Sequence, residues 1–209
     1  MNRKSDENKI RALRVAVTGG LACGKTEVAR VLRRLGAVVW DADAAVHRLL
    51  RRGTPVYGRI VRRFGPGILR ADGAINRRKL GDCVFATACE RRVLNALVHP
   101  AVIRELRAWL AAQQRQGRPA AAVVPLLYEV GLDCGWDAVI CVAADRSVAL
   151  RRLRQRGLSL RAAQQRLRAQ WPLARKVRRA DVVLWNNGTR RALAASARTA
   201  WAALMKKEK

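Results

Sequence analysis

The residues best suited to chemistry lie near the N-terminus, where Gly19, four residues and then Gly24-Lys25-Thr26 match the pattern G-x-x-x-x-G-K-[ST]. Glycines in such a loop let successive backbone amides turn toward a phosphate chain, and the helix that follows adds its positive end. Lys25 would supply a charge for the β- and γ-phosphates, and the Thr26 hydroxyl would ligate a bridging magnesium ion. The pattern therefore predicts a phosphate-binding loop. The structural alternative, a glycine turn, gives no reason for Lys25 and Thr26 to follow Gly24.

Carboxylates follow the next apolar stretch, residues 37–40, as Asp41 and Asp43. Ligands of open α/β sheets bind at the carboxyl ends of the strands, so a catalytic carboxylate is expected here. Asp43 also suits the role of an N-cap for the next helix, without any chemistry.

A second apolar strand, residues 120–124, ends in Pro125-Leu126-Leu127-Tyr128-Glu129, without the aspartate that commonly binds magnesium at this point in ATPases. Metal binding would then depend on Thr26, water and the pair of aspartates, with Glu129 as an outside candidate. His99, one of two histidines, is either a substrate contact or a structural group beside a proline.

Arginines are dense over residues 151–179, where the leucine spacing indicates two short helices joined at Gly157. Phosphoryl transfer needs cations around the transferred group, which favours a lid that closes on phosphates. A solvated basic helix face is the alternative for any single arginine.

Hydrophobic periodicity and turn residues predict the strands and helices around these groups. Further strands are expected over 137–142 and 180–185, and Asp145 is expected to cap a helix that runs through residue 156. Helices are expected over 27–35, 44–50, 56–64, 76–85 and 190–205, with a long helix after His99-Pro100. Since no strand separates the helices between residues 44 and 98, they indicate a helical insert over the active site, at about 54–98.

Composition limits the class of protein. A chain of 209 residues with 50% hydrophobic content predicts one α/β domain, with residues 1–12 as a flexible leader. Five cysteines without C-x-x-C spacing argue against a disulfide framework or a zinc cluster and favour a reduced, cytoplasmic location. No apolar stretch is long enough to span a membrane. The net charge of +28 fits nucleic acid, solvated helix faces or polyanionic nucleotides.

Several segments, in this order along nearly the whole chain, resemble the dephospho-coenzyme A kinase family. They are residues 18–26, Asp41-Ala42-Asp43, residues 95–100 with His99-Pro100, residues 124–129 with Pro125-Leu126-Leu127, the region 166–170, and residues 180–188. The phosphate loop alone is common to many kinases, whereas the other elements in this order are more specific.

The resemblance implies a three-layer P-loop kinase fold with a five-stranded parallel sheet, a helical substrate insert and an arginine-rich lid. It implies transfer of the γ-phosphoryl group of ATP to the ribose 3′-hydroxyl of dephospho-coenzyme A. In that reaction Asp43 would accept the hydroxyl proton, Lys25 with lid arginines Arg156 and Arg175 would stabilise the transferred group, and Thr26 with Asp41 would organise Mg²⁺. It further implies that ATP contacts Gly20, Leu21, Ala22, Cys23, Gly24, Lys25, Thr26 and Glu27, and that the acceptor contacts Asp41, Asp43, His99, Leu126 and Glu129.

The chain departs from the family at Cys23, where serine or glycine is usual, and a thiol in an electropositive loop is expected to have a lowered pKa and to react. Two other functions remain open: a related nucleoside or nucleotide kinase, and a nucleotide-dependent nucleic-acid-binding protein, which the weakly clustered charge disfavours. The base is Asp43 or, failing that, Asp41. The expected assembly is a monomer or a weak homo-oligomer.

Overall fold

The structure is a computed structural model that describes residues 12–206, apart from the side chains at 85, 86 and 88. Most of the expected leader lies outside the described residues. The chain divides into two compact units, which we call the sheet unit (up to Trp40 and from Trp109 on) and the helical unit (Asp41–Ala108). Each is described by itself.

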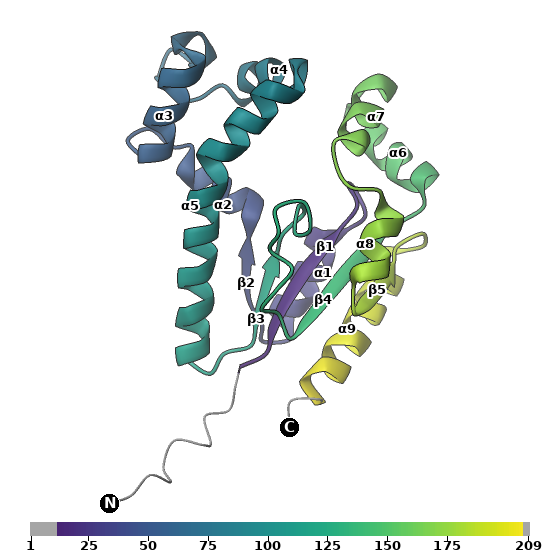
Figure 1. The fold of residues 1–209 in the computed structure, drawn as a ribbon. Coiled ribbons are helices and arrows are strands. Elements are labelled where there is room, and N and C mark those ends of the chain that lie inside the picture. The colour runs from purple at the N-terminus through teal and green to yellow at the C-terminus, as the bar shows by residue number, and fades with distance from the viewer. Residues whose placement is uncertain (1–11, 207–209) are drawn as a thin grey trace, which may run out of the picture. The chain divides into compact units, whose positions relative to one another are not determined.

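The sheet unit combines the strands with helices, whereas the helical unit is almost entirely helical (Figure 1). In chain order the elements are β1 Arg14–Gly19, α1 Lys25–Arg34, β2 Val38–Asp41, α2 Ala42–Leu49, α3 Pro55–Phe64, the 3₁₀ turn η1 Pro66–Ile68, α4 Arg77–Ala86, α5 Ala88–Arg115, β3 Ala120–Val123, β4 Ala138–Ala143, α6 Arg146–Gln155, α7 Leu160–Arg168, α8 Leu173–Arg179, β5 Val182–Trp185 and α9 Arg190–Lys206.

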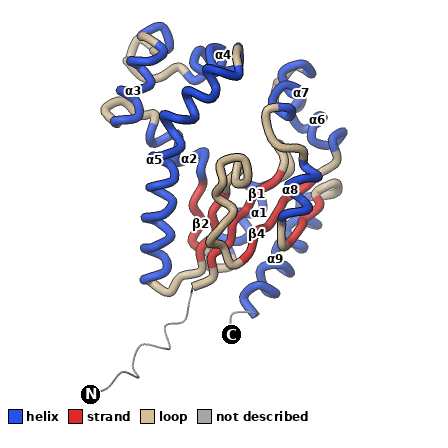
Figure 2. The backbone as a smooth tube through the Cα atoms, in the orientation of Figure 1, coloured by secondary structure: helices blue, strands red, loops and turns tan. Residues whose placement is uncertain are grey.

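The strands form one five-stranded sheet in the order β2-β3-β1-β4-β5 (Figure 2). β1 pairs in parallel with β3 and with β4, and β4 pairs in parallel with β5. This confirms the expected parallel α/β fold. The phosphate loop follows the carboxyl end of β1, the central strand. It therefore lies at the carboxyl edge of the sheet, where ligands of such sheets bind.

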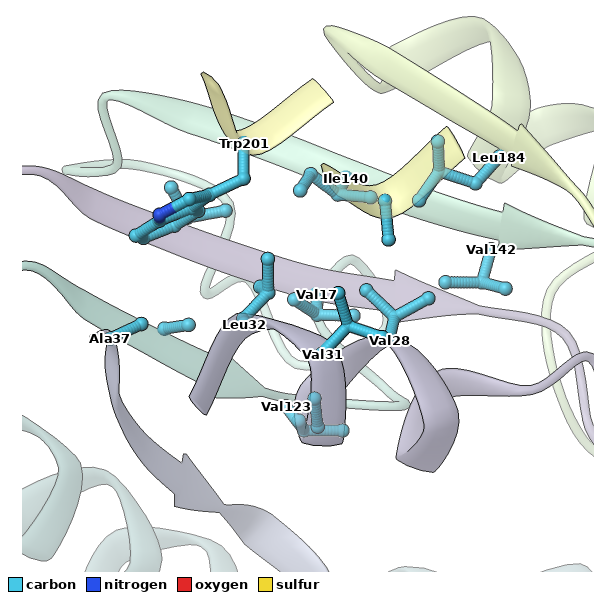
Figure 3. Close-up of a cluster of buried hydrophobic side chains, with 14 of the residues drawn as sticks. Val17, Val28, Val31, Leu32, Ala37, Val123, Ile140, Val142, Leu184 and Trp201 are labelled. Atoms are coloured by element: carbon cyan, nitrogen blue, oxygen red, sulfur yellow. The ribbon is translucent and has the colours of Figure 1, made fainter. Parts of the chain in front are cut away.

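The core of the sheet unit lies between one face of the sheet and the helices α1 and α9 (Figure 3). Alternate strand residues such as Val17, Ile140 and Val142 point into it, as the two-residue period of a strand requires. They pack against Leu32 of α1 and Trp201 of α9. This packing fixes α1, and with it the helix end that follows the phosphate loop.

Two expectations about the helices are wrong, and a third is confirmed only for the position of the cap. α2 begins at Ala42, and its N-cap is Asp41, whose carboxylate accepts the Ala44 amide at 3.0 Å, so Asp43 is not the cap. The segment 151–179 was expected to form two helices, but it contains the end of α6 and all of α7 and α8. Asp145 occupies the N-cap position of α6, but its side chain makes no capping hydrogen bond.

The long helix α5 begins at Ala88, eleven residues before His99 rather than after it, and contains Pro100. An internal proline removes one helical hydrogen bond and costs about 3 kcal/mol. Val98, Val102 and Leu106 are all buried, at the four-residue spacing of one helix face that runs through the proline. Burial of that face offsets the cost, and the helix continues.

Candidate phosphate-binding site

The phosphate loop joins β1 to α1, and two of its glycines have backbone conformations that other residues rarely adopt. Gly19 has a φ of 134° and Gly24 a φ of 105°. A Cβ atom at Gly19 would overlap the Val142 carbonyl oxygen, and one at Gly24 would overlap the Asn186 side chain. The glycines that the pattern requires are therefore also required by close packing in this chain.

Distant side chains hold the carbonyl groups of the loop. Asn186, which follows β5, donates from Nδ2 to the Cys23 carbonyl at 2.8 Å. Arg152 of α6 donates to Asn186 Oδ1 at 3.2 Å and to the Ala22 carbonyl at 3.4 Å. Sequence reasoning placed Arg152 among the arginines of the expected lid and Asn186 in a turn, and it predicted no contact of either with the loop. The position of Asn186 after a strand of the same parallel sheet was the available signal.

Lys25 folds back over the loop. Its Nζ donates to the Gly19 carbonyl at 3.1 Å and to the Gly20 carbonyl at 2.7 Å. Thr26 lies exposed on the first turn of α1, and Glu27 on the same turn pairs with Arg30. Lys25 and Thr26 thus lie at one helix start, whose backbone N–H groups and dipole favour anions. Asp41, the other expected metal ligand, is the last residue of β2.

Within residues 12–206, no group of three or more His, Cys, Asp or Glu side chains is arranged to hold a metal ion. A magnesium ion in a nucleotide site needs few protein ligands, since phosphate oxygens and water supply the rest of its six. The single hydroxyl of Thr26 fits that requirement.

The expectation that Cys23 has a lowered pKa is wrong. Cys23 is 1% exposed, and burial raises the pKa of its thiol despite the nearby charges of Lys25 and Arg152. A buried thiolate would lose more hydration than these cations return. Cys23 is therefore a packing residue of the sheet unit's core, which also contains Val28 and Leu193.

The turn after β3 is joined to the segment that begins α8. Oε1 of Glu129 lies 2.7 Å from Nζ of Lys176 and accepts the Trp171 amide at 2.9 Å. Leu126, in the same turn, is partly exposed. The structure thus gives Glu129 protein partners, and its expected roles toward substrate and metal stay predictions.

Aromatic rings and arginines form a stack beside this pair. The Arg175 guanidinium lies 3.4 Å from the centroid of the Trp171 ring, and Trp171 stacks on Tyr128 with centroids 6.0 Å apart. Arg179 lies 5.3 Å from the Tyr128 ring and pairs with Asp133 at 2.6 Å. Burial raises the pKa of Tyr128 to about 12, so the phenol stays neutral.

Arg156, the other expected lid arginine, occupies the C-cap position of α6 and is exposed.

In the helical unit, α2 carries the expected base, Asp43. Asp43 is exposed in the first turn, and His47 follows one turn later, with Nε2 in contact with Nη1 of Arg77 from α4. Desolvation and Arg77 lower the pKa of His47, and the charges of Asp43 and Asp41 partly oppose them. Sequence reasoning considered neither His47 nor Arg77, although His47 is four residues after Asp43 and so on the same helix face.

His99 lies half-buried in α5, and burial lowers the pKa of its imidazole. An imidazole with a lowered pKa is neutral at pH 7. His99 fits the structural role as well as the substrate contact, which stays a prediction.

A G-x-x-x-x-G-K-[ST] loop between the central strand of a parallel sheet and a helix defines a P-loop nucleotide-binding protein. A family model described as dephospho-CoA kinase matches residues 13–191, and the chain belongs to that family.

Relatives agree with this assignment, and a solved structure is similar over most of the chain. The chain is 45% identical over 180 residues to a dephospho-CoA kinase of Geobacillus kaustophilus, covering 85% of this chain and 90% of the relative. It is 46% identical over 185 residues to one of Anaeromyxobacter dehalogenans, covering 88% of each. The crystal structure of TT1252 from Thermus thermophilus aligns with a TM-score of 0.77 at 32% identity, over 92% of this chain and 97% of that one.

Proposed function

We propose that this protein is an ATP-dependent kinase that phosphorylates the ribose 3′-hydroxyl of dephospho-coenzyme A, the last step of coenzyme A synthesis. The observation behind the proposal is an intact phosphate loop in a chain that belongs to the dephospho-CoA kinase family from residue 13 to residue 191. The family match selects this acceptor over those of related nucleoside and nucleotide kinases.

The donor half of the reaction would use the phosphate loop and the residues 20–27 around it. Lys25 Nζ now bonds neutral carbonyl oxygens of Gly19 and Gly20, and the β- and γ-phosphates of ATP are stronger, charged acceptors. Nζ would therefore turn from the loop to the phosphates when ATP binds. Held by Asn186 and Arg152, the loop needs little rearrangement to receive them.

Thr26, with Asp41 as the second predicted ligand, would hold Mg²⁺ against the phosphate oxygens. When bound, the ion neutralises charge that develops on those oxygens. Arg156 and Arg175 would add positive charge around the transferred group.

The acceptor half would use Asp43 as the base. The 3′-hydroxyl oxygen attacks the γ-phosphorus, its proton passes to the Asp43 carboxylate, and the bond to the β-phosphate oxygen breaks with its electron pair leaving on ADP. His99, Leu126 and Glu129 are proposed contacts of the acceptor.

The part of the chain that the structure describes contains no helix able to span a membrane. A cytoplasmic location is part of the proposal, supported by the absence of disulfides among the five cysteines.

Release of ADP from magnesium-ATP, measured with and without dephospho-coenzyme A, tests the proposal directly. We expect acceptor-dependent release and formation of coenzyme A. Coenzyme A itself is the matched control, because its 3′-hydroxyl is already phosphorylated. Turnover with adenosine or AMP but not with dephospho-coenzyme A would favour the alternative kinase, and no acceptor-dependent turnover would refute the proposal.

A further inference from the structure

Lys176, in α8, is a charged residue with no solvent exposure, and the proposed reaction assigns it no role. Burying an ammonium group costs several kcal/mol unless a counter-charge and further hydrogen bonds compensate. A lysine with its Nζ at the surface would avoid that cost. The burial of this charge therefore indicates that Lys176 has a specific role.

The partners of Lys176 come from the strand ends at the carboxyl edge of the sheet. Nζ donates to the Pro125 carbonyl at 2.8 Å and pairs with Glu129 Oε1 at 2.7 Å. The Pro125 carbonyl also accepts the Thr18 hydroxyl at 3.3 Å, from the residue directly before the phosphate loop. The ammonium group thus joins α8 to the turn after β3, and the Pro125 carbonyl joins that turn to the end of β1.

Glu129 depends on this link. Its second oxygen, Oε2, is buried without a hydrogen-bond partner within residues 12–206. Among these residues the carboxylate therefore interacts with the Lys176 ammonium and the Trp171 amide, both through Oε1. Removal of the ammonium would leave a buried carboxylate with a single neutral donor. The pair therefore holds Trp171, the platform on which Arg175 lies.

The residues beside Lys176 on α8 lie close to the phosphate loop and to the stacked rings. A Cβ atom added at Gly20 would come 3.5 Å from Leu173 Cδ1, so the first residue of α8 rests against the loop. Arg175, which precedes Lys176, has its guanidinium 3.4 Å from the centre of the Trp171 ring. Fixing Lys176 therefore fixes the backbone and the platform of Arg175.

We propose that Lys176 is a positioning residue: its buried link to Glu129 and Pro125 holds Arg175 in the arrangement that phosphoryl transfer requires. This inference rests on the proposed kinase function and deepens it. A group that aligns a cation with the transferred phosphoryl affects kcat more than ATP binding, because charge on that group develops during the reaction.

The test separates positioning from stability by removing the charge pair in two ways. Lys176→Met alone leaves the Glu129 carboxylate buried and unpaired, and we expect the Tm to fall by roughly 10 °C. Lys176→Met combined with Glu129→Gln removes both charges and keeps an acceptor for the Trp171 amide. We expect its Tm within about 3 °C of the wild type, because neutral replacements of a buried pair are often tolerated.

In this double variant we expect kcat for dephospho-coenzyme A to fall roughly 10- to 30-fold, with the KM for ATP changed by less than about 3-fold. Arg178→Met is the control on the same helix: Arg178 is exposed, and both Tm and kcat should stay at the wild-type values. A double variant with wild-type kcat would make the pair purely structural. One that unfolds like Lys176→Met would assign Lys176 to stability alone. Either outcome overturns the proposal.

Adding Arg175→Ala to the double variant tests whether Lys176 acts through Arg175. If it does, Arg175→Ala lowers kcat in the wild type and has little further effect in the double variant, since coupled residues are not additive. Losses that multiply would overturn the proposed path. The proposed function fails separately, if the wild-type protein itself shows no turnover with dephospho-coenzyme A.

Discussion

The polar groups that support the phosphate loop in the sheet unit and those on α2 and α4 of the helical unit differ in burial. In the sheet unit the polar groups around the phosphate loop are buried: Thr18 and Lys176 have no exposure, and Asn186 is 7% exposed. In the helical unit Asp43, His47 and Arg77 are exposed side chains on helix surfaces. Buried polar groups are tied to the packing around them, whereas exposed ones can be changed with little effect on the fold.

This difference indicates in which unit stability and activity are coupled. A substitution beside the phosphate loop should affect both, because the same atoms shape the loop and fill the core. A substitution at the exposed Asp43 should affect the reaction with little effect on unfolding. The predictions below test that separation.

The largest effect is expected for Gly19→Ala. The new methyl group would overlap the Val142 carbonyl, and φ stays at 134°, so we expect a loss of at least ~3 kcal/mol in the free energy of unfolding and no measurable turnover. Gly36→Ala is the matched control, because Gly36 also has a positive φ of 89° but nothing within 4 Å of the added carbon. Its cost should be roughly 1 kcal/mol. Equal costs in denaturant unfolding would refute the close packing at Gly19.

Asp43→Asn should separate activity from stability in the helical unit. Loss of the proton acceptor should lower kcat by roughly 10²- to 10⁴-fold, while unfolding changes by less than about 1 kcal/mol. Asp82→Asn, an exposed carboxylate on α4 of the same unit, is the control and should leave turnover unchanged. An Asp43→Asn enzyme with wild-type kcat would move the base elsewhere, with Asp41 the first candidate.

Asp41 has a structural role that two substitutions can distinguish from chemistry. Asp41→Ala removes the cap on Ala44 and should cost about 1 kcal/mol of unfolding free energy. Asp41→Asn keeps a good capping group and should leave stability near that of the wild type. If Asp41 also helps to hold Mg²⁺, Asp41→Asn should raise the magnesium concentration needed for half-maximal turnover. An unchanged magnesium requirement would leave Asp41 with the cap alone.

Local patterns in the sequence predicted the phosphate loop, the strands and the strand end that carries Asp41, because glycine spacing and strand periodicity act over a few residues. The parallel five-stranded sheet was implied by the family resemblance. The contacts that hold the loop could not be predicted in this way: Asn186 and Cys23 are 163 residues apart, and Lys176 meets Glu129 only in the folded chain.

Where local rules failed, tertiary packing was stronger than the local preference. Burial of Val98, Val102 and Leu106 carries α5 through Pro100. At Cys23 the neighbouring Lys25 suggested a reactive thiol, but burial, which no local pattern records, determines its pKa.

The smallest effect concerns pH. Burial lowers the pKa of His99 in the folded protein below its ordinary value of 6.5, so near that pH the unfolded chain binds more protons than the folded one. Stability should therefore be complete above about pH 6.5 and decrease as pH falls from there through the lower, folded-state pKa. His99→Gln should reduce the decrease in unfolding free energy between about pH 7.5 and pH 5.5, measured by urea denaturation. His47→Gln should reduce it less, because His47 is exposed and lies near two aspartates. If His47→Gln had the larger effect, the exposed helix surface of α2 would be more strongly coupled to folding than the comparison of the two units allows.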